Sequence, residues 1–265
     1  MKENLDIRRA GPADAGRRVL LLPGGMCSKE FYADVLARPE VAGLGLVAVT
    51  MPGFARTEPP DDLSMEHYAR LLAECATAEG CTLVAGHSLG ANVAIEMAAL
   101  GVFTGPLVLL SPTFSRADEA KFLGVLDQVG RIPAVGPLAW TAMLRTMPAM
   151  MKKEMLAGGI PQERAEQLAA DLGNNDPAFC RELVHHYYGY LDRHPSLVDR
   201  LLGSGARSWV VRGDHDEIGL KEEERLELEE SSLVTLVTVP DAGHLLLVEQ
   251  PAATARVIAE AAAGR

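Results

Sequence analysis

TLVAGHSLGANVAIEMAAL, residues 82–100, joins an apolar run of strand length to an apolar run of helix length through Gly86-His87-Ser88-Leu89-Gly90. A direct turn from a strand into a helix is so tight that side chains flanking its centre would clash, so glycine is needed two residues to either side. The turn exposes the Ser88 hydroxyl at a helix N-terminus, where free N–H groups and the helix dipole favour developing negative charge. The other interpretation is an ordinary glycine turn. Ser88 is therefore a candidate nucleophile, and the Leu89 N–H is a candidate oxyanion donor.

The rest of the chain alternates short apolar runs with longer amphipathic ones. Most short runs are apolar at consecutive positions, which indicates strands buried on both faces, as in a parallel sheet covered by helices. Leu5–Arg9 is expected to add one antiparallel edge strand. The other expected strands are Val19–Leu22, Leu46–Thr50, Thr82–Ala85, Leu107–Leu110, Ser208–Arg212 and Leu233–Val239.

Capping residues mark the helices between these strands. Ser64 is expected to cap one helix, and Gly101 to close the apolar helix that follows Ser88. Pro251 suits the first turn of an alanine-rich helix near the C-terminus. The dense charge of Lys221–Glu230 predicts a solvated helix face.

Residues 112–204 break the alternation, because they contain helical pieces with Gly/Pro punctuation and no buried-strand run. We expect a helical lid inserted into one α/β domain, whose core comprises residues 1–111 and 205–265. Methionines in the insertion can line an adaptable apolar pocket or can pack its own helices, and the sequence leaves both open. The clustered methionines are Met143, Met147, Met150, Met151 and Met155.

Composition excludes several classes of function. The formal net charge is −11 and the aromatic content only 5%, so the chain would repel nucleic acid and offers no platform for stacked bases. No run approaches the length of a membrane span, and the N-terminus has no apolar signal segment. The four cysteines form no CxxC pair and have no metal-ligand spacing. These features predict a cytoplasmic protein without a membrane or nucleic-acid partner and without a metal site.

Four motifs follow four of the expected strands, and together they resemble the α/β-hydrolase superfamily, in its serine-nucleophile branch. They are the turn around Ser88, Pro23-Gly24-Gly25, Gly213-Asp214-His215-Asp216 and Ala242-Gly243-His244. The order serine, acid, histidine is the order of that family. Each motif also lies at the carboxyl end of a strand, where open α/β sheets place their sites. The resemblance covers nearly the whole chain and implies the α/β-hydrolase fold.

The resemblance implies a catalytic triad of Ser88, Asp216 and His244. A serine hydroxyl needs a base to take its proton, and the turn before His244 can bring an imidazole back over the sheet. The family pattern favours Asp216 as the acid that orients the imidazole, with Asp214 as the alternative. The second oxyanion donor is expected to be the N–H of Gly25, with Met26 as the alternative.

Other histidines are expected to have lesser roles, and the chain departs from the family pattern twice. His87 is expected to pack beneath the turn, while His185 and His186 either line a pocket or simply pack or face solvent. Pro23 replaces the histidine that commonly opens the oxyanion turn. In the segment 50–57, which we interpret as structural, Thr50 and Ala55 replace an aspartate and a glycine.

The expected function is therefore hydrolysis of a small to medium, largely apolar carboxylic ester or lactone through an acyl-enzyme. Thioesterases and carbon–carbon bond hydrolases share the same triad and remain alternatives. A ligand-binding protein that keeps the scaffold without hydrolysis is the alternative of another class. The small-molecule substrate is the only expected partner, no cofactor is expected, and the oligomeric state stays open.

Overall fold

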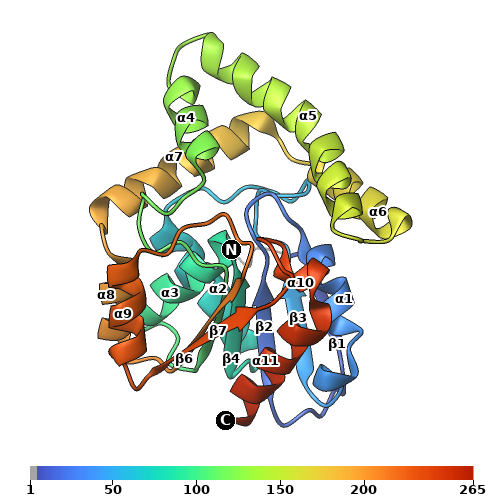
Figure 1. Ribbon diagram of the computed structural model, residues 1–265, viewed down its shortest axis with the longest axis vertical. Helices are drawn as coiled ribbons and strands as arrows, with labels where there is room; N and C mark the ends of the chain where they lie inside the picture. The colour runs from blue at the N-terminus through green and yellow to red at the C-terminus, as the bar shows by residue number, and fades with distance from the viewer. Residues whose placement is uncertain (1–4, 265) are drawn as a thin grey trace.

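A computed structural model describes residues 5–264 and contains one seven-stranded sheet of order β1-β3-β2-β4-β5-β6-β7 (Figure 1). β1 pairs antiparallel with β3, and every other pairing is parallel. The predicted antiparallel edge strand is thus confirmed, although it begins two residues later than expected. The strands are β1 Ile7–Ala10, β2 Arg18–Leu22, β3 Gly45–Val49, β4 Leu83–His87, β5 Leu107–Leu110, β6 Ser208–Gly213 and β7 Val234–Val239.

The central strands are buried on both faces, which explains why their apolar residues are consecutive. In β2, Leu20 and Leu22 belong to the core on one side of the sheet, and Val19 and Leu21 belong to the core on the other. All four side chains are fully buried. Successive residues of a strand point to opposite faces, so a strand between two helical layers needs apolar residues at every position.

Helices cover both faces of the sheet (Figure 1). Side chains of α2, α3 and α8 form the core on one face, and those of α1, α10 and α11 form the core on the other. The first layer is α2 Met65–Ala78, α3 Leu89–Ala99 and α8 Leu197–Ser204, with α9 Glu222–Glu230 beside α8. The second is α1 Ala33–Leu36, α10 Leu246–Glu249 and α11 Pro251–Ala263, together with the short 3-10 helices η1 Lys29–Tyr32 and η2 Pro39–Val41.

Four helices lie together above the sheet, at one end of the molecule, and we call them the cap (Figure 1). They are α4 Lys121–Gly130, α5 Val135–Ala157, α6 Gln162–Leu172 and α7 Pro177–Arg193. Residues 112–204 contain no strand, although α8, the last helix of this segment, packs against α3 in the layer beside the sheet. Its buried side chains Leu197, Val198 and Leu201 account for that position.

The clustered methionines mostly pack against the hydrophobic core. Met155 is buried, and Met143, Met147 and Met151 lie against core residues. Met150 is the exception, with 60% of its surface exposed. Packing against core residues therefore describes four of the five.

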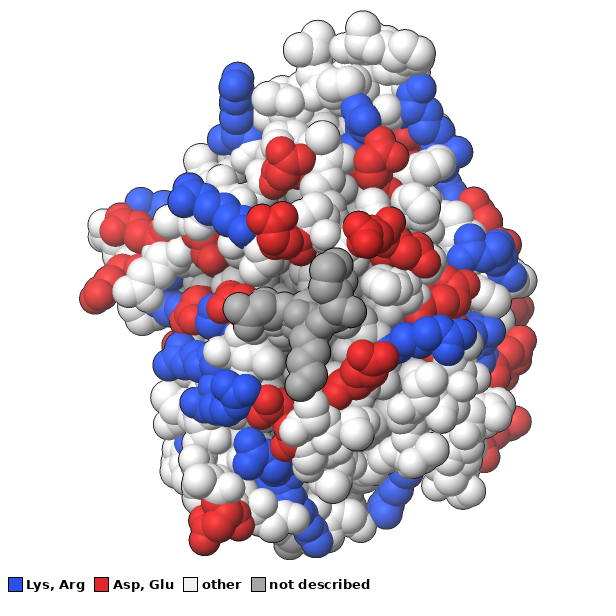
Figure 2. Space-filling view, turned by 180° about the vertical axis from the view of Figure 1, so that it is seen from behind, with Lys and Arg blue, Asp and Glu red and all other residues white. Residues whose placement is uncertain are grey.

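Charged side chains lie mainly at the surface, where acidic and basic residues are interspersed on the face shown in Figure 2. Helix α9 carries the predicted run of charge, but Glu224 and Leu228 turn inward and are buried. Lys221, at its N-cap, donates to the buried Ser115 hydroxyl at 2.6 Å. Within residues 5–264, no helix has the length and apolarity that crossing a membrane requires.

Candidate active site

The turn between β4 and α3 is as tight as its two glycines imply. Ser88 has φ +50° and ψ −120°, a conformation that side-chain-bearing residues rarely adopt. A Cβ on Gly86 would lie 2.3 Å from the Gly90 carbonyl oxygen, and one on Gly90 would lie 2.5 Å from the Leu22 carbonyl oxygen. Neither contact is sterically possible. The backbone packing therefore demands glycine at both positions and holds Ser88 at the start of α3.

Three segments that are far apart in sequence meet above this turn. His244 Nε2 lies 3.1 Å from Ser88 Oγ, and His244 Nδ1 lies 3.1 Å from Asp216 Oδ1. Because an ionised carboxylate can only accept, Nδ1 carries the proton and Nε2 is free to accept from the Ser88 hydroxyl. The arrangement can move a proton from a hydroxyl to an imidazole that a carboxylate orients.

The environment of Asp216 keeps its carboxylate ionised. The side chain is 1% exposed, and Oδ1 also accepts from the Ile218 N–H at 3.0 Å. Burial alone would raise the pKa of Asp216. The hydrogen bond and charge of His244, with the neighbouring Ser111 hydroxyl and the Ile218 N–H, outweigh burial and lower the pKa to about 2.

Asp214, the alternative acid, has a different role. Its side chain is 37% exposed, and its carboxylate accepts from the Ala242 N–H at 3.2 Å. That contact fastens the turn before His244 to the loop after β6. Asp214 thus stabilises the backbone that carries His244, while Asp216 meets the imidazole.

His87 packs beneath the turn, and it also makes a contact that the sequence did not predict. Its Nε2 lies 2.8 Å from the His244 carbonyl oxygen, and the residue is 1% exposed. Burial and the nearby His244 imidazole lower the pKa of His87 to about 3, so the ring is neutral and donates from Nε2. The residue before Ser88 therefore holds the backbone of His244.

The turn after β2 approaches Ser88 closely. A Cβ on Gly24 would lie 2.8 Å from His87 Nδ1 and 3.3 Å from Ser88 Cβ. In the described part of the chain, the Gly25 N–H has no hydrogen-bond acceptor. Leu89 is the first residue of α3, so its N–H has no partner within the helix. Within residues 5–264, two backbone N–H groups in the segments next to Ser88 are thus without an acceptor.

Thr50 and Ala55, the two replaced residues of the segment 50–57, have local structural roles. The Thr50 hydroxyl donates to Asp6 at 2.9 Å and accepts from the Lys29 N–H at 3.2 Å. It therefore links β3 to the segment that follows the Gly24–Gly25 turn. Ala55 adopts φ +47°, the left-handed conformation that glycine would adopt more readily.

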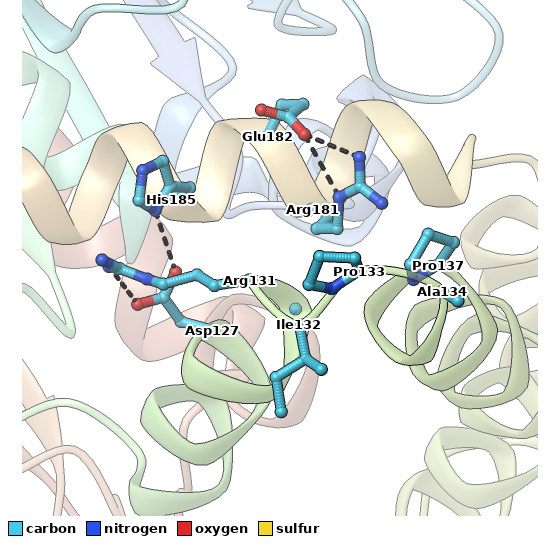
Figure 3. A pocket seen from close by; sticks show the side chains of 10 residues that line it. Asp127, Arg131, Ile132, Pro133, Ala134, Pro137, Arg181, Glu182 and His185 are labelled. Atoms are coloured by element: carbon cyan, nitrogen blue, oxygen red, sulfur yellow. Dashed lines mark hydrogen bonds and ion pairs between the residues drawn. The ribbon is translucent and has the colours of Figure 1, made fainter.

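Figure 3 shows a pocket on the cap whose lining residues do not include Ser88. It is formed between the α4–α5 connection and α7, and its volume is about 320 Å³. Its charged side chains pair with one another, Asp127 with Arg131 and His185, and Arg181 with Glu182. His185 therefore lines this pocket, while His186 is exposed. No cluster of three or more His, Cys, Asp or Glu side chains suited to a metal ion occurs in residues 5–264.

A parallel sheet with a serine turn after one strand, an acid after another and a histidine after the last defines an α/β-hydrolase architecture. The sequence profile described as "Alpha/beta hydrolase family" matches residues 19–257, and the chain belongs to that family. No curated protein matches the chain in sequence.

Solved structures with the same fold cover nearly the whole chain. An esterase from Thermogutta terrifontis is 21% identical, with a TM-score of 0.73, over 97% of this chain and 92% of its own. An esterase from Exiguobacterium antarcticum is 15% identical, with a TM-score of 0.74, over 98% and 95%. A thioesterase domain from the curacin biosynthetic pathway is 16% identical, with a TM-score of 0.69, over 96% and 94%. At these identities the likeness establishes the fold.

Proposed function

We propose that this α/β hydrolase cleaves a small to medium, largely apolar carboxylic ester or lactone through a covalent acyl-enzyme. One observation supports the proposal above all others, the pair of 3.1 Å contacts that join Ser88, His244 and Asp216 in a single chain of proton donors and acceptors. An acid, a base and a nucleophile in this order are the parts that acyl transfer requires. The esterases among the structural neighbours are consistent with it.

Ser88 Oγ attacks the carbonyl carbon while His244 Nε2 takes its proton. The Asp216 carboxylate holds the imidazole by Nδ1 and stabilises the cation that forms. The carbonyl oxygen becomes an oxyanion and accepts from the N–H groups of Leu89 and Gly25, with Met26 as the alternative second donor. Collapse of this intermediate breaks the bond to the leaving alkoxide, which departs with the proton from His244.

Hydrolysis of the acyl-enzyme repeats the same steps with water. His244 takes a proton from the water molecule as its oxygen attacks the acyl carbon. The second tetrahedral intermediate then releases the carboxylic acid and returns the proton to Ser88 Oγ. For a lactone, the alcohol and the acid are parts of one product.

Apolar side chains around the Ser88 turn favour an apolar substrate. A Cβ on Gly25 would lie 3.5 Å from the Leu89 side chain and 4.0 Å from the Phe54 ring. Phe179, from α7 of the cap, stacks edge-on against Phe54 with ring centroids 5.3 Å apart. A charged acyl group next to these side chains would lose hydration without gaining a partner.

The decisive experiment replaces Ser88 and measures turnover of p-nitrophenyl esters of increasing chain length. We expect Ser88→Ala to lose about 10³-fold or more of kcat, because the substitution removes the hydroxyl that attacks the carbonyl carbon. Ser231→Ala, a serine in the connection between α9 and β7, is the matched control and should retain full activity. Unchanged turnover in Ser88→Ala would refute the assignment.

Two further measurements separate the alternatives. A panel of esters, lactones, acyl thioesters and vinylogous diketones distinguishes an esterase from a thioesterase or a carbon–carbon bond hydrolase with the same triad. Labelling by a fluorophosphonate reports an activated serine, so a protein that only binds ligands would remain unlabelled at Ser88.

A further inference from the structure

Asn175, in the connection between α6 and α7, is a buried polar side chain that contacts both the turn after β2 and the loop after β3. It is 9% exposed. Its Nδ2 donates to the Met26 carbonyl at 2.7 Å and to the Leu172 carbonyl at 2.9 Å. Its Oδ1 accepts from the Ala55 N–H at 3.0 Å. One amide thus joins the cap to the turn after β2 and to the loop after β3.

Both loops that Asn175 contacts are conformationally strained. Met26 has φ +66° and Ala55 has φ +47°, although neither is glycine. The left-handed region is sterically unfavourable for an L-residue, so such a residue persists there only where its surroundings hold it. The Asn175 amide supplies a hydrogen bond to each of these two residues. The turn after β2 also has a backbone hydrogen bond of its own, from the Cys27 N–H to the Gly24 carbonyl at 3.2 Å.

The same end of the cap is fixed to the core at several neighbouring points. The Asp171 carboxylate accepts from the Ser28 N–H at 3.2 Å. Arg164 forms an ion pair with Asp34 at 2.7 Å and donates to the Glu30 carbonyl at 2.6 Å. These contacts fix α6 against the segment that follows the turn, so the amide of Asn175 approaches Met26 from a rigid support.

We propose that Asn175 is a positioning residue that sets the shape of the oxyanion turn from the cap, an inference that rests on the proposed function. Its bond to the Met26 carbonyl fixes the peptide between Met26 and Cys27. The N–H of that peptide, on Cys27, donates to the Gly24 carbonyl at 3.2 Å, and this carbonyl lies in the same peptide plane as the Gly25 N–H. The bond from Asn175 thus helps to set the direction of the Gly25 N–H. The cap is then part of the catalytic geometry as well as a cover. In the described part of the chain, the hydrogen bonds of Asn175 go to Met26, Leu172 and Ala55 and not to Ser88, so it acts through the turn.

The test compares Asn175→Leu, which has similar size and no hydrogen bonds, with Asp176→Ala at the next position. Asp176 caps α7 by accepting from the Phe179 N–H at 2.8 Å, and it is exposed. We expect Asn175→Leu to lower kcat by about 10- to 100-fold with KM within about threefold, because a misplaced donor weakens the transition state more than the ground state. Asp176→Ala should lose some thermal stability and keep its kcat.

A second variant keeps the proposal testable if Asn175→Leu does not fold. Asn175→Asp retains an acceptor for the Ala55 N–H and sets a carboxylate oxygen against the Met26 carbonyl. Its activity relative to the wild type should rise as the pH falls toward 5, because the protonated carboxyl can again donate to that carbonyl. A merely structural residue would give a ratio that does not change with pH.

The outcomes separate this proposal from the proposed function. If Ser88→Ala abolishes turnover while the kcat of Asn175→Leu stays within threefold of that of Asp176→Ala, the positioning role is wrong and the hydrolase stands. A pH-independent ratio for Asn175→Asp has the same meaning. If Ser88→Ala remains active, the proposed function itself fails.

Discussion

His87 provides a sharp test of the buried geometry, because its imidazole is held neutral by the fold. Its pKa is about 3 in the folded protein, against about 6.5 in an unfolded chain. At mildly acidic pH the His87 imidazole therefore binds a proton in the unfolded state and stays unprotonated in the folded state. This lowered pKa contributes stability above pH 6.5, and the contribution is lost as the pH falls from 6.5 toward 3.

The magnitude follows from these two pKa values. Between pH 7 and pH 5 the unfolded imidazole becomes almost fully protonated while the buried one does not, so the free energy of unfolding falls by about 2 kcal/mol through His87 alone. His87→Gln removes this titration and keeps an amide that can donate to the His244 carbonyl. The other histidines are common to both proteins, so their contributions cancel in the comparison.

The assay is urea denaturation at pH 7 and pH 5 for the wild type, His87→Gln and the exposed-site control His186→Gln. We expect the loss between the two pH values to be about 2 kcal/mol smaller in His87→Gln than in the wild type. The control should lose nearly as much as the wild type. A difference below about 0.5 kcal/mol would show that His87 is not held neutral by burial.

Three further predictions concern other parts of the molecule. Asp216→Asn should keep the fold and lower kcat about 10⁴-fold, since an amide favours the wrong tautomer of His244, and steady-state kinetics measures the loss. Glu96 is fully buried and accepts hydrogen bonds from Tyr190 at 2.8 Å and from Arg200 at 2.6 to 2.9 Å. In denaturant titrations Glu96→Ala should therefore lower the free energy of unfolding by about 3 to 5 kcal/mol. The same substitution should lower it by less in a protein that already carries Arg200→Met, because the buried charge of Arg200 is then absent. Burial raises the pKa of Cys75 to about 11 and the pKa values of Cys81 and Cys180 to about 12. A disulfide reagent at pH 8 should therefore leave these thiols unmodified until denaturant is added, and rapid modification of the native protein would contradict their burial.

Most of the sheet could be predicted from sequence because burial on two faces leaves a local pattern. The consecutive apolar residues of β2 and β5, and the glycines around Ser88, each reflect a constraint that acts within a few residues. The family order then predicted that His244 and Asp216 would lie near Ser88. In the structure His244 lies 3.1 Å from the Ser88 hydroxyl on one side of its ring and 3.1 Å from the Asp216 carboxylate on the other.

The contacts that sequence reasoning missed depend on long-range packing. The His87 ring meets the His244 carbonyl across 157 positions, and Asn175 reaches Met26 across 149. A local pattern carries no signal for either pairing, because each side chain would be equally acceptable at a surface. The charge of α9 likewise predicted a solvated face, and the burial of Glu224 depends on Lys221 and Ser115, whose approach only the fold determines.

The backbone at Ser88 has a consequence for how this protein could acquire new chemistry. Two close backbone approaches enforce its unusual conformation, that of Gly86 to Gly90 and that of Gly90 to the end of β2. Neither approach involves the Ser88 hydroxyl. A cysteine or an aspartate at the same place would meet the same backbone and inherit the same presentation toward the imidazole. The nucleophilic atom at this turn can therefore be replaced, by evolution or by design, while the backbone of the turn and the sheet stays the same.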